Sequence, residues 1–74
     1  MKVYVMTEAK VMGYDVYKGI AKTKKEAEKA FRREYPHMGI EGIEDRKTTY
    51  ASEAYDLHNI KPTLRWLHIY EEEL

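Results

Sequence analysis

The residue types that hydrolases use for nucleophilic catalysis occur close together once in the sequence, around Ser52. Asp56 and His58 follow this serine, which is the only serine of the chain. A hydrolase activates its serine hydroxyl with a histidine, and a carboxylate orients that histidine. The stretch YASEAYD contains nothing that resembles the strained turn on which such a serine stands, so it is typical of an ordinary loop hydroxyl. We therefore expect a protein that is not an enzyme and that has no catalytic residues.

Histidine is the next residue type to consider, because it binds metals and the chain has no cysteine to do so. The three histidines, His37, His58 and His68, lie far apart and lack the paired spacing of zinc motifs. We expect His68 to pack on a strand face beside Trp66 and Tyr70, and His37 to lie in a loop. A zinc site made by all three histidines stays open as an alternative. The chain also lacks a glycine-rich loop that would hold phosphate, so the sequence predicts no metal site and no cofactor.

The stretch TKKEAEKAFRREYP, residues 23 to 36, predicts an amphipathic helix from about Lys24 to Tyr35. Thr23 and Glu26 form a capping-box pattern at its start, and Pro36 ends it. The apolar arc, which we expect to pack on a sheet, consists of Ala27, Ala30, Phe31 and Tyr35. The opposite arc carries the basic residues Lys25, Lys29, Arg32 and Arg33. These four residues are either the solvated side of an ordinary helix or a surface that binds an acidic partner, protein or nucleic acid.

Alternation of side chains with a period of two predicts the strands. KVYVMTEAKV and YDVYKGIAK both alternate, and the short link with Gly13 between them predicts a hairpin. The second of these stretches places Tyr14, Val16, Lys18 and Ile20 on one side, and Asp15, Tyr17, Gly19 and Ala21 on the other. One more strand is expected somewhere in Lys47 to Leu57, with a loop on each side. The last stretch, TLRWLHIYEEEL, predicts a central strand because both of its faces are largely apolar.

Together these elements predict one small α+β domain over residues 1 to 74. We expect the order β-β-α-β-β, with three to four antiparallel strands in a small sheet and one helix packed on one face. A chain of 74 residues buries only a thin core. The lack of cysteine and of a long apolar segment indicates a cytoplasmic protein outside the membrane.

The net charge of zero conceals a division along the chain. Up to His37 there are nine Lys and Arg against five Asp and Glu, and from Met38 onward there are four against eight. The first part thus has a charge of +4 and the second part a charge of −4. Such a division can give a molecule two oppositely charged surfaces that steer a partner. The alternative is that the two halves lie side by side and their charges interleave.

Aromatic residues are more numerous than a thin core needs, with seven tyrosines and one tryptophan in the chain. Since one helix covers only one face of a sheet, some rings should lie on the other face. They would either pave that face by cross-strand packing or form a surface for binding or for a homodimer through the open sheet face.

We therefore expect a non-enzymatic protein that binds a macromolecule, with a protein as the favoured partner. The candidate contact residues are Glu44, Asp45, Tyr50, Tyr55 and Trp66. The alternative is a weak nucleic-acid-binding module that uses Lys25, Lys29, Arg32 and Arg33. In size, architecture and composition the chain is similar to short accessory proteins of bacteria, phages and mobile elements, some of which inhibit a host enzyme by binding it. That likeness implies that the acidic second half imitates nucleic-acid phosphates at a basic site.

Overall fold

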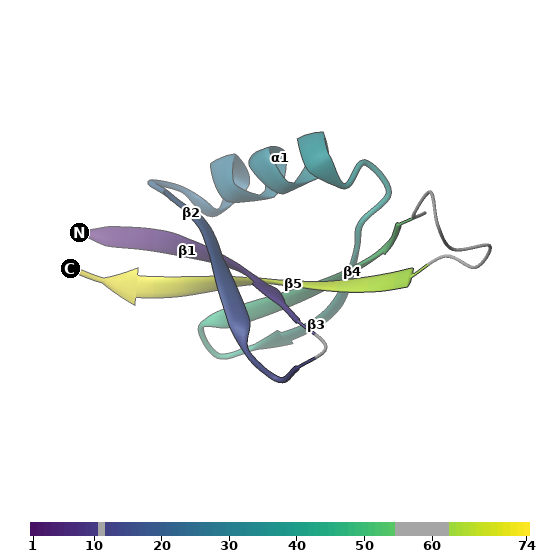
Figure 1. Cartoon of the computed structure of the whole chain (residues 1–74). Helices are drawn as coiled ribbons and strands as arrows, with labels where there is room; N and C mark the ends of the chain where they lie inside the picture. Colours follow the sequence, from purple (N-terminus) through teal and green to yellow (C-terminus); the bar gives the residue numbers. More distant parts are fainter. Residues whose placement is uncertain (11, 55–62) are drawn as a thin grey trace.

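A computed structural model describes residues 1–10, 12–54 and 63–74, which form one helix and one sheet of five strands. The elements along the chain are β1 (Lys2–Ala9), β2 (Asp15–Ala21), α1 (Lys24–Glu34), β3 (Gly39–Glu44), β4 (Lys47–Ala54) and β5 (Thr63–Glu73). The strand order in the sheet is β2-β1-β5-β4-β3, and every neighbouring pair is antiparallel. The helix lies along one side of the sheet, and the two chain ends lie next to each other (Figure 1).

The predicted α+β class is confirmed, but the predicted count of three to four strands is wrong. The structure has five strands in the order β-β-α-β-β-β, and the additional one is β3, Gly39–Glu44. Its sequence, GIEGIE, contains two glycines, and a bulge at Glu41 interrupts its pairing with β4. All six residues are exposed because β3 is an edge strand. An edge strand of this kind has no buried face to produce a clear alternation.

The helix begins and ends where the local signals predict. The Thr23 hydroxyl accepts a hydrogen bond from the Glu26 amide at 3.1 Å, and the Tyr35 amide donates to the Phe31 carbonyl at 2.7 Å. Ala27 and Phe31 are buried against the sheet. Ala30 is exposed, so the prediction that both alanines face the sheet is wrong for this one. The buried face of the helix, Ala27 and Phe31, is therefore narrower than the sequence predicts.

The hydrophobic core lies between α1 and the face of the sheet that we call the covered face. Met6 of β1, Leu67 and Ile69 of β5 and Tyr50 of β4 meet Phe31 there. The helix packs over β1, β2 and β5. The prediction that the last stretch is a central strand is confirmed, because β5 pairs with β1 on one side and β4 on the other.

A bulge in β2 changes which residues share a face. Met6 pairs with Gly19 but Thr7 pairs with Tyr17, so Lys18 is an additional residue in the strand. Gly19 has a φ of 154°, a conformation that residues with a Cβ rarely adopt. The bulge places Tyr17 and Ile20 on the same side of the sheet, whereas uninterrupted alternation had predicted opposite sides.

Candidate functional site

The side of the sheet opposite α1, which we call the uncovered face, carries the largest exposed side chains of the strands. Alternation from the paired registers places on this face Tyr17 and Ile20 of β2, and Leu64, Trp66, His68 and Tyr70 of β5. No element in the described part of the chain packs on it, since α1 contacts only the other side and β2 does not contact β3 or β4. The prediction of rings on the face that the helix leaves open therefore agrees with the described residues.

Trp66 is prominent on this face because its neighbours are small. Its cross-strand partners are Ala9 on β1 and Ala51 on β4. The Trp66 side chain is 40% exposed, and Tyr17 and Ile20 are 64% and 54% exposed. Ile40 and Ile43 on the covered side of β3 are similarly exposed, at 54% and 66%, so the uncovered face is distinguished by its exposed rings, Tyr17 and Trp66, and not by exposure alone.

A polar network joins four strands at the centre of the uncovered face. Asp15 accepts hydrogen bonds from the Thr7 hydroxyl at 3.2 Å and from the Tyr70 hydroxyl at 3.3 Å. The His68 Nδ1 lies 3.0 Å from the Thr49 hydroxyl oxygen, and the His68 and Tyr70 ring centroids are 5.9 Å apart. These contacts fix the rings in position from β2 to β4.

Burial sets the protonation of the two central rings. It lowers the pKa of His68, and this effect outweighs the nearby Asp15 carboxylate, which acts in the opposite direction. Burial also raises the pKa of Tyr70, and Asp15 raises it further. At neutral pH the imidazole is therefore uncharged and the phenol is protonated.

The Thr49 hydroxyl beside the His68 imidazole resembles a nucleophile beside its base. Among the described residues Asp15 accepts hydrogen bonds from Thr7 and Tyr70, and none joins it to the imidazole. Neither of the two hollows described below is lined by Thr49 or His68. Among the described residues the pair has neither an orienting carboxylate nor a hollow beside it, and its hydrogen bond joins β4 to β5.

The uncovered face is acidic. The pairing of the described strands places four acidic residues on it, Asp15, Glu44, Glu53 and Glu72. Lys47 is the only basic residue that this pairing places there. Lys47 is itself 3.8 Å from a Glu44 carboxylate oxygen. Gly39, Ala51 and Trp66 are paired in one row across β3, β4 and β5. A hollow of about 310 Å³ lies at the β3 end of this row and is lined by His37, Gly39, Glu41, Ala51, Glu53 and Leu64.

The outer side of α1 carries a group of basic residues. Lys25, Lys29, Arg32 and Arg33 are all exposed, and none forms an ion pair with another described residue. The two halves of the chain are neighbours, since β1 pairs with β5, as the interleaving alternative assumed. Their charges interleave in part, because Glu71 and Glu73 of β5 have the phase of the covered face, whereas Glu44, Glu53 and Glu72 lie on the uncovered face.

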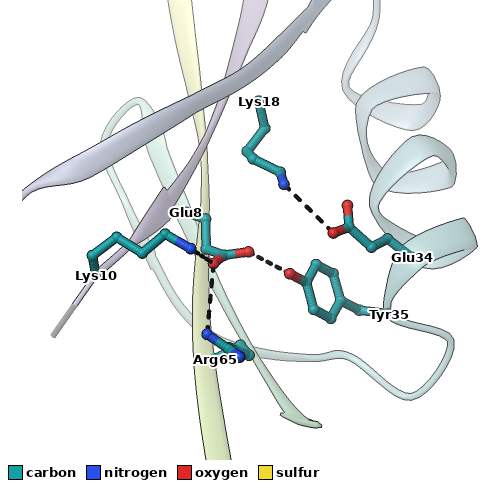
Figure 2. A network of polar contacts seen from close by, with 6 residues as sticks. All are labelled: Glu8, Lys10, Lys18, Glu34, Tyr35 and Arg65. Carbon is teal, nitrogen blue, oxygen red and sulfur yellow. Dashed lines mark hydrogen bonds and ion pairs between the residues drawn. The ribbon is translucent and has the colours of Figure 1, made fainter. Parts of the chain in front are cut away.

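The covered face contains one buried carboxylate, that of Glu8, which is 2% exposed (Figure 2). It accepts a hydrogen bond from Lys10 Nζ at 2.5 Å and one from the Tyr35 hydroxyl, and Arg65 lies 4.0 Å away. Burial alone would raise the pKa of Glu8, but the hydrogen bonds from Lys10 and Tyr35 hold it below its usual value.

This Glu8 cluster fastens the end of α1 to the sheet. Tyr35 is the C-cap of the helix, so its bond to Glu8 ties the helix end to β1. Lys18 and Glu34, 3.4 Å apart, make a second connection, from β2 to the helix (Figure 2). The two hollows found among the described residues do not border Glu8, and its ionised carboxylate is fully engaged, which indicates a structural role.

The structure separates the predicted contact residues. Trp66 and Glu44 lie on the uncovered face, and Asp45 follows Glu44 in the β3–β4 turn with a φ of 24°. Asp45 lines a smaller hollow of about 120 Å³, together with Ile43 and Arg46.

Tyr50 lies in the core instead of on a surface. It is fully buried and donates a hydrogen bond to Glu28 at 2.9 Å, so it is not available to a partner in this structure. Tyr55, and the Asp56 and His58 that were weighed with Ser52, lie outside the described residues. Ser52 itself is buried on the covered face opposite Arg65.

Comparison of the chain with protein-family models, with curated proteins and with solved structures gave no match. Within residues 1–10, 12–54 and 63–74, no helix has the length and apolar character needed to cross a membrane. Function must therefore be argued from the geometry of the two faces.

Proposed function

We propose that the protein is a non-enzymatic binding module that recognises another protein with the uncovered face of its sheet. The observation that carries this proposal is the exposure of Tyr17, Ile20 and Trp66 on one face that no described element covers. Tryptophan and tyrosine are the residues most enriched at the energetic centres of protein interfaces. The Asp15 network holds the neighbouring rings in place before a partner arrives, which limits the ordering cost of binding.

The charges of the uncovered face favour a protein over a nucleic acid there. A sheet that stacks bases needs cations to meet the phosphates. Here the rings stand among Asp15, Glu53 and Glu72, which would repel a phosphate backbone. The same charges oppose a symmetric homodimer through this face, because the dimer would bring equal carboxylates together.

A second candidate function uses the other side of the molecule. Lys25, Lys29, Arg32 and Arg33 are exposed on α1 without an ion pair to any described residue. If these four cations meet four phosphates, the slope of log K against log salt is about −3 to −4. Glu26 and Glu28 interrupt this basic surface, which is why we rank it second.

Photo-crosslinking distinguishes the two surfaces. A photoreactive phenylalanine analogue replaces Tyr17 on the uncovered face in one variant and Lys29 on the outer side of α1 in the other. We expect a covalent adduct with a discrete protein from position 17 and none from position 29. Adducts from position 29 alone, together with salt-sensitive retention of DNA or RNA in a gel shift, would replace the first function with the second.

A further inference from the structure

We infer, on the basis of the proposed function, that the partner presents a basic segment in extended form and that one of its arginine side chains enters the hollow beside Trp66. The inference concerns the chemistry of the partner, and it follows from the shape of this hollow, its charges and the spacing of carboxylates across the sheet.

The shape of the hollow suits a long side chain. Two of its lining residues are small, Gly39, which has no side chain, and Ala51, which has only a methyl group. Ala51 is the cross-strand partner of Trp66, so Trp66 follows the lining residue Ala51 on the neighbouring strand without lining the hollow itself, and Leu64 lines the hollow further along β5. An arginine has an apolar stem that can contact Leu64 and Ala51, and a planar head that stacks on an indole.

The charges of the hollow also favour a cation. Glu41 and Glu53 both line it, and neither forms an ion pair with another described residue. Two carboxylates beside an arginine head can accept several of its five N–H groups. An acidic side chain would be repelled, and an uncharged amide would donate at most two N–H groups and bring no positive charge.

The distance between Asp15 and Glu53 sets the spacing that two cations of the partner segment would need. Asp15 on β2 and Glu53 on β4 lie three strand spacings apart, or about 14 Å, and Glu53 lies two residues, or about 7 Å, beyond the register of Asp15, so the two are about 16 Å apart, a distance that two long arginine side chains can span from backbone positions about 13 Å apart. An extended peptide rises about 3.3 Å per residue, so residues four apart lie about 13 Å apart and point to the same side. A segment with arginines at positions i and i+4 can therefore meet Glu53 and Asp15 at once.

A second copy of the chain is the competing occupant, because its helix is basic. The cations of α1 are Lys25, Lys29, Arg32 and Arg33, in helical spacing. Lys25 and Arg33 are about 12 Å apart along the helix axis, so spacing alone does not exclude this occupant, but a helix-to-sheet contact between copies is heterologous and would build an open chain of copies rather than a closed dimer. The geometry thus favours an extended segment of another protein.

Trp66 allows a direct test, because it is the only tryptophan of the chain and stands beside the hollow. The probe is a synthetic heptapeptide with arginines four residues apart among glycines and serines. Two control peptides carry glutamine in place of both arginines, or the two arginines side by side. Affinity is measured from Trp66 fluorescence for the wild type, Glu53→Gln, Glu41→Gln and the matched control Glu26→Gln, which removes the same charge from α1.

We expect saturable binding of the spaced-arginine peptide, about tenfold weaker binding by Glu53→Gln and by Glu41→Gln, and an unchanged affinity for Glu26→Gln. Equal affinity of all four proteins, or equal binding of the glutamine peptide, would overturn the inference. So would equal binding of the peptide with adjacent arginines. A salt-sensitive change in Trp66 fluorescence with protein concentration alone would identify a second copy as the occupant and also overturn it.

The two proposals fail in different ways. If crosslinking at position 17 captures a protein but the arginine peptide does not bind the hollow, the partner chemistry is wrong and the binding module stands. If position 17 captures nothing, the proposed function itself fails.

Discussion

The two faces of one sheet differ in what their side chains do. On the covered face Phe31 packs on Leu67, and the one buried carboxylate, Glu8, is bonded by its neighbours. On the uncovered face Trp66 and Tyr17 are partly exposed, and carboxylates stand beside them. The first face contains the buried contacts of a thin core, whereas the second leaves large rings partly exposed. If this division is correct, substitutions on the two faces should affect different measurements.

The largest loss of stability is expected from Phe31→Ala. Phe31 is 1% exposed and is the main side chain through which α1 contacts the sheet. Truncation of a buried phenylalanine costs about 3–5 kcal/mol, which is a large share of the stability of a domain this small. Urea unfolding followed by circular dichroism measures the loss, and Phe31→Leu provides a milder variant if the alanine variant does not fold. A loss of similar size for Trp66→Ala would break the distinction between the faces.

Glu8→Gln should cost about 2–3 kcal/mol, because it leaves Lys10 and Arg65 without their buried carboxylate. The pKa of Glu8 is lowered in the folded protein, so its contribution to stability is present above the usual value of 4.5. That contribution is lost as the pH falls through the folded-state pKa. Urea midpoints between pH 7 and pH 3 should therefore fall less steeply for Glu8→Gln than for the wild type. Glu26→Gln, which removes an exposed carboxylate, should follow the wild type.

Gly19→Ala tests the bulge that brings Tyr17 and Ile20 to one face. A Cβ at this position has room, since its nearest neighbour would be Met6 Sδ at 3.8 Å, but the φ of 154° disfavours it. We expect a loss of about 1–2 kcal/mol from backbone strain alone. Thermal unfolding measures it, and Gly39→Ala, at an open position without a positive φ, is the control. An unchanged midpoint for Gly19→Ala would show that the strand tolerates another backbone conformation there.

The parts of the fold that depend on local signals were predictable. Thr23 and Pro36 mark the helix, and the alternation around Trp66 marks β5, because caps and periods act over a few residues. The bulge at Lys18 was not predictable, since it is defined by pairing with β1 and not by the sequence of β2 itself. Strand β3 was missed for a similar reason, because Gly39–Glu44 gains its structure by pairing with β4.

The candidate site was predicted in part. Trp66 was identified correctly as a residue of a strand face, whereas Tyr50 was assigned to a surface and is buried. Its neighbours Thr48 and Ser52 are small polar residues that share its face, so no apolar alternation marked that face as buried. Glu8 was overlooked, although it has the same phase as Tyr4 and Met6 in β1 and so lies on the covered face.

A smaller effect on the pH dependence of stability is expected from His68. It tests whether the imidazole is uncharged in the folded protein. Its pKa is lowered from 6.5 by burial, with Asp15 acting against and Lys47 acting with this shift. As the pH falls below 6.5, the unfolded chain binds a proton that the folded protein resists, so stability decreases. The change in urea midpoint between pH 8 and pH 5.5 should be smaller for His68→Gln, which stays neutral. A titration of the His68 ring by NMR at or above 6.5 would contradict this expectation.

The smallest effect on stability and a large effect on binding are expected together for Tyr17→Ser. Tyr17 is 64% exposed and none of the hydrogen bonds among described residues involves its hydroxyl, so unfolding free energy should stay within about 0.5 kcal/mol of the wild type. Ile43→Ser is the matched control, because Ile43 is 66% exposed and pairs with Thr48, on the covered side of the sheet. If the uncovered face binds a protein, Tyr17→Ser should weaken the affinity for the partner identified by crosslinking by about tenfold or more. Ile43→Ser should leave that affinity unchanged. Equal loss from both variants would mean that exposed apolar area anywhere on the molecule supports the interaction. The separation of stability from binding is what distinguishes a recognition face from the outer surface of a core, since a ring that serves only to cover its neighbours cannot be removed without a cost in folding.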